Sequence, residues 1–333
     1  MTDTSRPGAQ GPAGPSVASR RAGFAFAFTA YGLWGILPLY FLALAPTGPF
    51  EIVAWRVLLS LVFCAVLLTA TRAWRPLVAL ARDRRVLLVM AAAGALIYVN
   101  WQTYVYATAS DQVVEASLGY FINPIVTVFL GVLVLRERLR ALQWVAVAIS
   151  FVAVLVLTFA HGGLPWIALV LAFSFGCYGL IKKRVGGRVD AVAGLTLESA
   201  WLAPLAIVQL VVVATTSGLT LGAAGPVHAL LLLCAGAVTA VPLLAFAAGS
   251  RRLPLVSMGF IQYLAPVIQF VVGVAVLGEP MPLERWIGFA LVWLAIAVLL
   301  VDLAQAAGRG RAARRALAAS EDRDAPEAPV GPV

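Results

Sequence analysis

The stretch at residues 100–140 reads NWQTYVYATASDQVVEASLGYFINPIVTVFLGVLVLRERLR. It is mostly apolar and long enough for two membrane crossings of about 20 residues each. It nevertheless carries Asn100, Gln102, Glu115 and Asn123, and polar groups at membrane depth are costly unless they face a cavity or a partner. The stretch therefore predicts two membrane helices that form part of the wall of a transport path.

The composition of the whole chain also indicates a membrane protein. Its 333 residues are 62% hydrophobic and only 12% charged, whereas a soluble domain is about one quarter charged. The net charge of +9 does not indicate a nucleic-acid-binding protein, because the basic residues form short clusters between apolar runs. The three cysteines lie within apolar runs and lack metal-ligand spacing, so neither a metal site nor a cofactor is expected.

Enzymatic motifs do not emerge from the sequence. It contains no nucleophile elbow, no phosphate-binding loop and no paired aspartates. We therefore expect a protein that is not an enzyme, and a lipid-handling enzyme is the least supported alternative.

Ten apolar runs are long enough to serve as membrane spans. They lie at 22–44, 51–70, 86–108, 113–135, 141–160, 164–181, 194–215, 227–248, 255–277 and 285–304. Only Ser110, Asp111 and Gln112 mark the turn between the third run and the fourth, so nine spans is the alternative. Arg20 and Arg21 precede the first run as in a signal peptide, but the run is longer than the usual core of about 7–15 residues. An uncleaved first helix is expected.

The connections between these runs alternate in basic content. The loops after spans 2, 4, 6 and 8 carry Arg or Lys clusters, whereas the loops after spans 1, 3, 5 and 7 carry none. Cytoplasmic loops collect Lys and Arg, so both termini are predicted to be cytoplasmic in a multi-pass protein of the inner membrane. The ends, 1–21 and 305–333, are predicted to be disordered cytoplasmic tails, and the basic part of the second tail either contacts lipid headgroups or stays solvated.

An internal repeat emerges when the chain is shifted by about 142 positions. The coinciding pairs are Pro124 with Pro266, Gly131 with Gly273, Leu135 with Leu277, Glu137 with Glu279, and Trp144 with Trp286. Each half, 22–160 and 161–304, holds five spans, and this odd number places the second half upside down in the membrane. The predicted fold is all-α, with ten transmembrane helices in two inverted five-helix repeats whose site lies between the halves. Chance similarity between apolar helices is the alternative.

Polar and aromatic side chains inside the spans are the candidates for the substrate path or for coupling. They are Trp34, Arg56, Asn100, Trp101, Tyr104, Glu115, Tyr120, Asn123, Glu198, Gln262, Tyr263 and Gln269. The amides Asn123 and Gln269 could instead make interhelical hydrogen bonds, and the aromatic side chains could instead anchor helix ends at the membrane interface.

Two roles are open for Glu115 and Glu198: carrying a proton, or forming a structural ion pair. For Glu115 one example of such a partner is Arg56, the one arginine placed well inside a predicted span. Pro124 and Pro266 are candidate hinges, because each removes a backbone donor and can bend a helix. Plain packing kinks are the alternative for both prolines.

The chain resembles the RarD-type branch of the EamA family, in the drug/metabolite transporter superfamily. The resemblance rests on EASLGYFINP (115–124), LRERLR (135–140), FSFGCYGLIKK (173–183) and IQYLAP (261–266). It implies ten spans in two inverted repeats that move small metabolites or drugs, often outward. We therefore expect a secondary transporter that works by alternating access, with a small-molecule substrate, membrane lipid around it, and protons as an open candidate for coupling. A membrane scaffold or accessory subunit without a transport path is the alternative.

Overall fold

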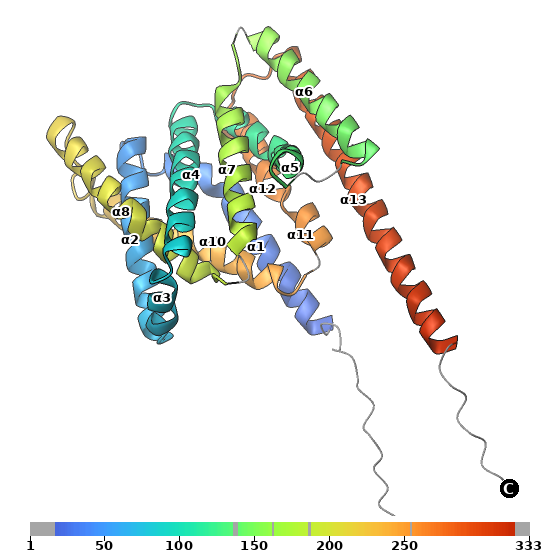
Figure 1. Ribbon diagram of the computed structural model, residues 1–333. Coiled ribbons are helices and arrows are strands. Elements are labelled where there is room, and N and C mark those ends of the chain that lie inside the picture. The colour runs from blue at the N-terminus through green and yellow to red at the C-terminus, as the bar shows by residue number, and fades with distance from the viewer. Residues whose placement is uncertain (1–16, 136–138, 162, 186–187, 254, 324–333) are drawn as a thin grey trace, which may run out of the picture. The chain divides into compact units, whose positions relative to one another are not determined.

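The computed structural model describes residues 17–135, 139–161, 163–185, 188–253 and 255–323, and every regular element within these ranges is a helix (Figure 1). The helices are α1 (Val17–Leu42), α2 (Pro49–Ala70), α3 (Trp74–Ala81), α4 (Arg84–Ala109), α5 (Val113–Leu135), α6 (Ala141–His161), α7 (Trp166–Val185), α8 (Ala191–Thr216), α9 (Pro226–Leu233), α10 (Ala235–Ser250), α11 (Leu255–Ile261), α12 (Leu264–Val271), the π-helical η1 (Val272–Val276) and α13 (Leu283–Arg323).

Most of the long apolar helices have the length that a bilayer requires. In the described part of the chain, eight apolar segments are long enough to cross a membrane: α1, α2, α4, α5, α6, α8, the pair α9–α10, and α13. The apolar parts of α7 and α12–η1 are shorter. Each of the ten predicted spans overlaps one of these helices or helix groups. The protein is a helical multi-pass membrane protein.

The predicted disordered tails are partly helical. Residues 305–323, predicted to be disordered, continue α13, and residues 17–21 belong to α1. The prediction was wrong there because amino-acid composition alone does not include the effect of a neighbouring helix that is already formed. Extending a formed helix avoids the cost of nucleation, and the Ala- and Arg-rich sequence after 305 favours extension.

The basic loop after α2 contains a further helix, α3, and leads into a capped helix. The Asp83 carboxylate accepts hydrogen bonds from the backbone N–H groups of Arg85 and Val86 at the start of α4, at 3.0 and 3.4 Å. It also pairs with Arg188, 3.0 Å away, in the connection before α8. The two backbone bonds, with the Arg188 guanidinium, lower the pKa of Asp83.

The ninth predicted span is broken, whereas the fourth is continuous. The two residues between α11 and α12 are Gln262 and Tyr263. Pro266 explains the break, because its ring has no N–H for the Gln262 carbonyl four residues earlier and collides with it. Pro124, its counterpart in the repeat, lies within the unbroken helix α5. The two prolines therefore have different local effects.

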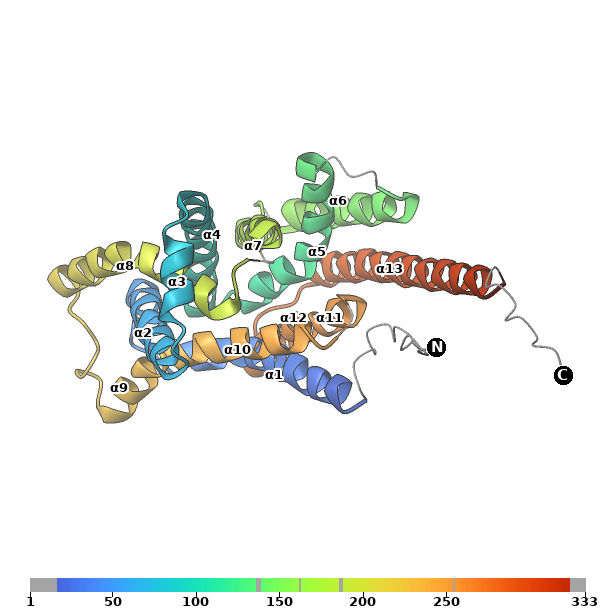
Figure 2. The same ribbon diagram turned by 60° about the horizontal axis from the view of Figure 1, so that its bottom comes forward.

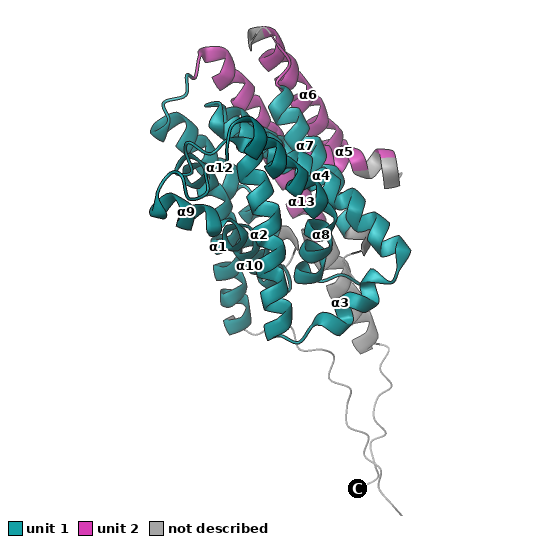
Figure 3. Cartoon of the chain, turned by 90° about the vertical axis from the view of Figure 1, so that its left-hand side faces the viewer, with its two compact units in different colours: residues 1–123, 166–280 teal, residues 124–165, 281–333 magenta. Residues whose placement is uncertain are grey.

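The chain forms two compact units (Figure 3). Unit 1 comprises 1–123 and 166–280, and unit 2 comprises 124–165 and 281–333. In unit 1, α2 packs against α8 and α10, α4 packs against α7 and α8, and α10 lies along α1 (Figure 2). In unit 2, α6 packs along α13.

Small residues allow two of the close helix contacts in unit 1. A Cβ on Gly119 of α5 would come within 2.7 Å of the Ala168 carbonyl oxygen of α7. A Cβ on Gly236 of α10 would collide with the Leu59 carbonyl of α2. Both glycines therefore serve helix packing, as small residues commonly do in membrane proteins.

Candidate functional site

An arginine lies buried inside unit 1. Arg56 is carried by the apolar helix α2, and only 5% of its surface is exposed. Its Nε donates a hydrogen bond to the Thr239 hydroxyl of α10 at 2.8 Å. The guanidinium carbon lies 4.3 Å from the centre of the Trp101 ring of α4 and 5.4 Å from the Phe41 ring of α1. The guanidinium charge is thus stabilised by two cation–π contacts and one hydrogen bond to a neutral hydroxyl.

This guanidinium has no carboxylate partner among the described residues. The ion pairs defined there include Arg140–Asp302, Lys182–Glu198 and Arg188–Asp83, and none of them involves Arg56. The Nη1 atom of Arg56 is buried without a hydrogen-bond partner, and the electrostatic neighbours are tyrosine hydroxyls. Burial of an unpaired charge costs several kcal/mol, so the chain maintains this arrangement at a considerable energetic cost.

Polar and aromatic groups from other helices surround the guanidinium. The Tyr104 and Tyr120 rings are 5.6 Å apart in an edge-to-face contact, and the Tyr120 hydroxyl donates to Asn100 Oδ1 at 3.0 Å. The Tyr104 hydroxyl and the Gln269 Oε1 are buried without hydrogen-bond partners, and these two side chains lie next to each other. We call this set the Arg56 cluster: Phe41, Arg56, Asn100, Trp101, Tyr104, Tyr120, Thr239 and Gln269.

Six of the predicted site residues therefore meet in one place: Arg56, Asn100, Trp101, Tyr104, Tyr120 and Gln269. Trp34 touches the cluster through its backbone carbonyl, which accepts a hydrogen bond from Gln269 Nε2 at 3.0 Å. The ring of Trp34 packs instead against Tyr31 and Phe246.

The remaining candidates on α5 and in the broken span have other contacts. Glu115 Oε1 accepts the Ile167 backbone N–H at 3.1 Å, at the start of α7. Among the described residues it is not ion-paired with Arg56, the example of a partner considered above. Asn123 donates to the Ala172 carbonyl of α7 at 3.0 Å, and Tyr263 stacks on Phe121 with ring centres 6.5 Å apart. Gln262 lies half-buried at the break before α12.

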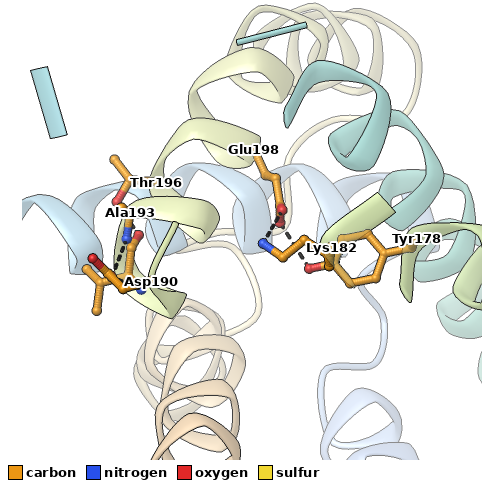
Figure 4. Close-up of polar contacts among 7 residues, drawn as sticks. Tyr178, Lys182, Asp190, Ala193, Thr196 and Glu198 are labelled. Atoms are coloured by element: carbon orange, nitrogen blue, oxygen red, sulfur yellow. Dashed lines mark hydrogen bonds and ion pairs between the residues drawn. The ribbon is translucent and has the colours of Figure 1, made fainter. Parts of the chain in front are cut away.

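Glu198 of α8 lies in a second polar site, next to α7 (Figure 4). Its carboxylate is 2% exposed and is 2.7 Å from the Lys182 ammonium. The Tyr178 hydroxyl donates to its other oxygen at 3.2 Å. The structural ion pair left open for Glu198 is therefore present, although Lys182 was not among the predicted site residues.

A third polar site was missed. Glu51, at 1% exposure, accepts hydrogen bonds from the backbone N–H and the hydroxyl of Thr220. The Thr220 and Thr47 hydroxyls are 2.7 Å apart, and Thr47 is 2.7 Å from Nε2 of the buried His228. The partners lie about 170 to 180 positions apart in the chain, so local sequence carries no signal for this network.

The repeat residue Glu279 has a defined contact as well. Its carboxylate oxygens accept the backbone N–H groups of Val113 and Val114 at 2.6 and 2.9 Å, and thereby cap the start of α5. Its counterpart in the repeat, Glu137, and the neighbouring Arg136 and Arg138 lie outside the described residues.

A polar site buried among many membrane helices, with contributions from distant parts of the chain, is the architecture of a membrane transport protein. Residues 21–159 match the EamA-like transporter family. Over 299 residues the chain is 46% identical to "Protein RarD" of Streptomyces exfoliatus, covering 90% of this chain and 94% of that protein. It is 39% identical to an "Uncharacterized transporter" of Vibrio cholerae, covering 91% and 98%.

The chain belongs to the RarD-type branch of the EamA-like transporter family. A solved crystal structure matches with a TM-score of 0.54 and 19% identity, over 85% of this chain and 97% of the other. That similarity concerns the fold alone.

Proposed function

We propose that the protein is a secondary transporter that moves a small metabolite or drug-like molecule across the cytoplasmic membrane by alternating access. The supporting observation is the Arg56 cluster, whose buried polar groups come from α2, α4 and α5 in the first half and from α10 and α12 in the second. Transporter sites lie between such halves. Export is the favoured direction, as the family resemblance implies.

The proposal includes ten spans in two inverted repeats, 22–160 and 161–304. This part of the proposal is supported by helix contacts within unit 1. When each helix of a contacting pair is replaced by its counterpart in the other half, the result is another contacting pair. The contact of the first and eighth spans, α1 with α10, becomes that of the sixth and third, α7 with α4. The contact α4–α8 likewise becomes α10–α2. In unit 2, the contacting helices α6 and α13 are the fifth and tenth spans.

Both termini are proposed to be cytoplasmic, on the basis of the alternating basic loops. In a background without the native cysteines, single cysteines at Ser110 and His161 should react with an impermeant thiol reagent outside intact cells. A cysteine at Gly187 should react only after the membrane is opened. Equal labelling of the Gly187 position in intact cells would exclude this topology.

The transport activity is testable with the purified full chain in liposomes. Uptake of a metabolite panel should exceed uptake by protein-free liposomes and should saturate for at least one compound. A folded protein that moves none of the panel, in either direction, would favour the scaffold alternative.

Proton coupling is a separate part of the proposal, with Glu115 and Glu198 as candidates. Flux with and without a pH gradient measures the coupling. Glu115→Gln should abolish pH-driven flux while leaving substrate exchange in place if Glu115 carries the proton. Normal pH-driven flux in this variant would exclude Glu115.

A further inference from the structure

We infer that the Arg56 cluster binds the carboxylate of a small monoanionic substrate with an aromatic or apolar body. This inference rests on the proposed transport function and names the substrate class for the same site. It follows from four observations: a missing counter-ion, unused hydrogen-bond donors, a single positive charge and aromatic walls.

The counter-ion must come from outside the described chain. The buried carboxylates of unit 1 are already engaged elsewhere: Glu51 with Thr220, Glu198 with Lys182, and Glu279 with the start of α5. Glu115 is engaged with the start of α7. Glu51 lies on the same helix as Arg56, only five positions away, yet binds neutral donors. A bound anion would supply the charge that Arg56 lacks.

The unused donors match a carboxylate. Arg56 Nη1 and the Tyr104 hydroxyl belong to neighbouring side chains and are both buried without a hydrogen bond of ordinary length, although the Gln269 side chain lies beside the Tyr104 hydroxyl. A guanidinium N–H and a phenol O–H can each donate to a carboxylate oxygen, and such charge-assisted bonds are the strong ones. The Thr239 bond fixes the guanidinium through Nε, so Nη1 stays available.

The charge balance favours a monoanion. Arg56 is the one cationic side chain of the cluster, and the other described ion-pairing cations, such as Lys182 and Arg188, are engaged in the pairs given above. A carboxylate would neutralise Arg56, whereas a phosphate ester with nearly two negative charges would leave excess charge buried. Such uncompensated charge is costly at this depth.

The walls of the cluster favour an aromatic or apolar body. Phe41 and Trp101 lie against the guanidinium, and Tyr104 contacts both Phe41 and Tyr120 edge-to-face. Aromatic rings offer large apolar contact areas at defined geometry. A ligand that displaces part of this ring packing would retain similar contacts through its own body.

The experiment uses thermal unfolding of the purified full chain in detergent. The probes are benzoate, phenylacetate and 3-phenylpropanoate, each beside its amide, and phenyl phosphate. At least one acid should raise the unfolding temperature more than its amide and more than phenyl phosphate. Arg56→Gln should weaken binding of that acid by about 10–150-fold, as expected for loss of a hydrogen bond to a charged group.

Two further variants make the result decisive. Arg56→Lys keeps the charge and should retain the preference for the acid with weaker affinity, which preserves the test if Arg56→Gln does not fold. Arg252→Gln is the matched control, because the Arg252 guanidinium lies 5.3 Å from the Phe26 ring centre and has its own backbone partner. It should bind the acid like the unmodified protein.

Three results would overturn the inference: equal shifts with every acid and its amide, an acid shift unchanged in both Arg56 variants, or a larger shift with phenyl phosphate. Because unfolding reports binding alone, failure of the transport proposal looks different. Acid binding without flux in liposomes would exclude the transport proposal. Flux of neutral solutes that is unchanged by Arg56→Gln would exclude only the proposed anion site.

Discussion

Removal of Lys182 should destabilise the protein more than removal of the charge on its partner Glu198. The carboxylate of Glu198 is 2% exposed, whereas the Lys182 side chain is 28% exposed. Lys182→Met leaves a buried carboxylate with only the Tyr178 hydroxyl, and breaking a buried pair this way costs about 3–5 kcal/mol. Glu198→Gln leaves an ammonium that can turn toward water, so its cost should be only about 1–2 kcal/mol.

The double variant tests the reasoning further. If the two costs were independent, their sum would be about 4–7 kcal/mol. Since the double variant has no unpaired charge, its cost should instead stay close to that of Glu198→Gln alone, about 1–2 kcal/mol. The difference, about 3 kcal/mol or more, is the coupling energy of the pair.

The free energy of unfolding can be measured by titration with sodium dodecyl sulfate in mixed micelles. Arg188→Met is the matched control, because it breaks the exposed pair with Asp83 and should cost far less than Lys182→Met. Equal costs for Lys182→Met and Glu198→Gln, or additive costs in the double variant, would show that the asymmetric burial of this pair does not govern its energetics.

Three other predictions concern packing, pH and the broken span. Gly119→Ala should lower the free energy of unfolding by about 1–3 kcal/mol through overpacking against α7, whereas Gly179→Ala, with no atom within 4 Å of the new Cβ, should be neutral or stabilising in the same titration. The lowered pKa of Asp83 means that its stabilising effect is present above about pH 4 and is lost as the pH falls through the folded-state pKa; unfolding temperatures of the unmodified protein and Asp83→Asn should therefore differ at pH 6, and the difference should shrink as the pH falls below about 4. Pro124→Ala and Pro266→Ala should each slow flux in liposomes while leaving the folded yield nearly intact if both are hinges, and lost yield with unchanged specific activity would make them packing residues.

The positions of the helices were largely predictable, because membrane thickness sets a length that apolar runs must meet. What could not be predicted was the local continuity of each helix. The break at Gln262–Tyr263 follows from Pro266, but Pro124 at the matching place leaves α5 continuous. Whether a helix breaks depends on what its neighbours offer to the freed carbonyl, and a single sequence does not contain that information.

The candidate site was predicted as a set of residues but not as an arrangement. Polar and aromatic side chains are rare within spans and need partners there. This rule identified Arg56, Asn100, Tyr104 and Gln269. Their partners could not be identified, because Thr239 is 183 positions from Arg56. Glu115 was chosen by the same rule, yet it binds the backbone of α7, since a helix start offers N–H groups that satisfy a carboxylate as well as a cation does.

The distance between Arg56 and Thr239 in the chain also bears on how the protein is made. At about 5–20 residues per second, a ribosome needs about 10–40 s to reach Thr239 after Arg56 has been synthesised. The nascent helix α2 therefore enters the lipid with an arginine whose hydrogen-bond partner does not yet exist. Its apolar residues must offset an insertion cost of about 2.5–3.5 kcal/mol without help from α10. During that interval the incomplete chain depends on a neighbouring helix such as α1, or on the insertion machinery, to keep the Arg56 charge away from lipid.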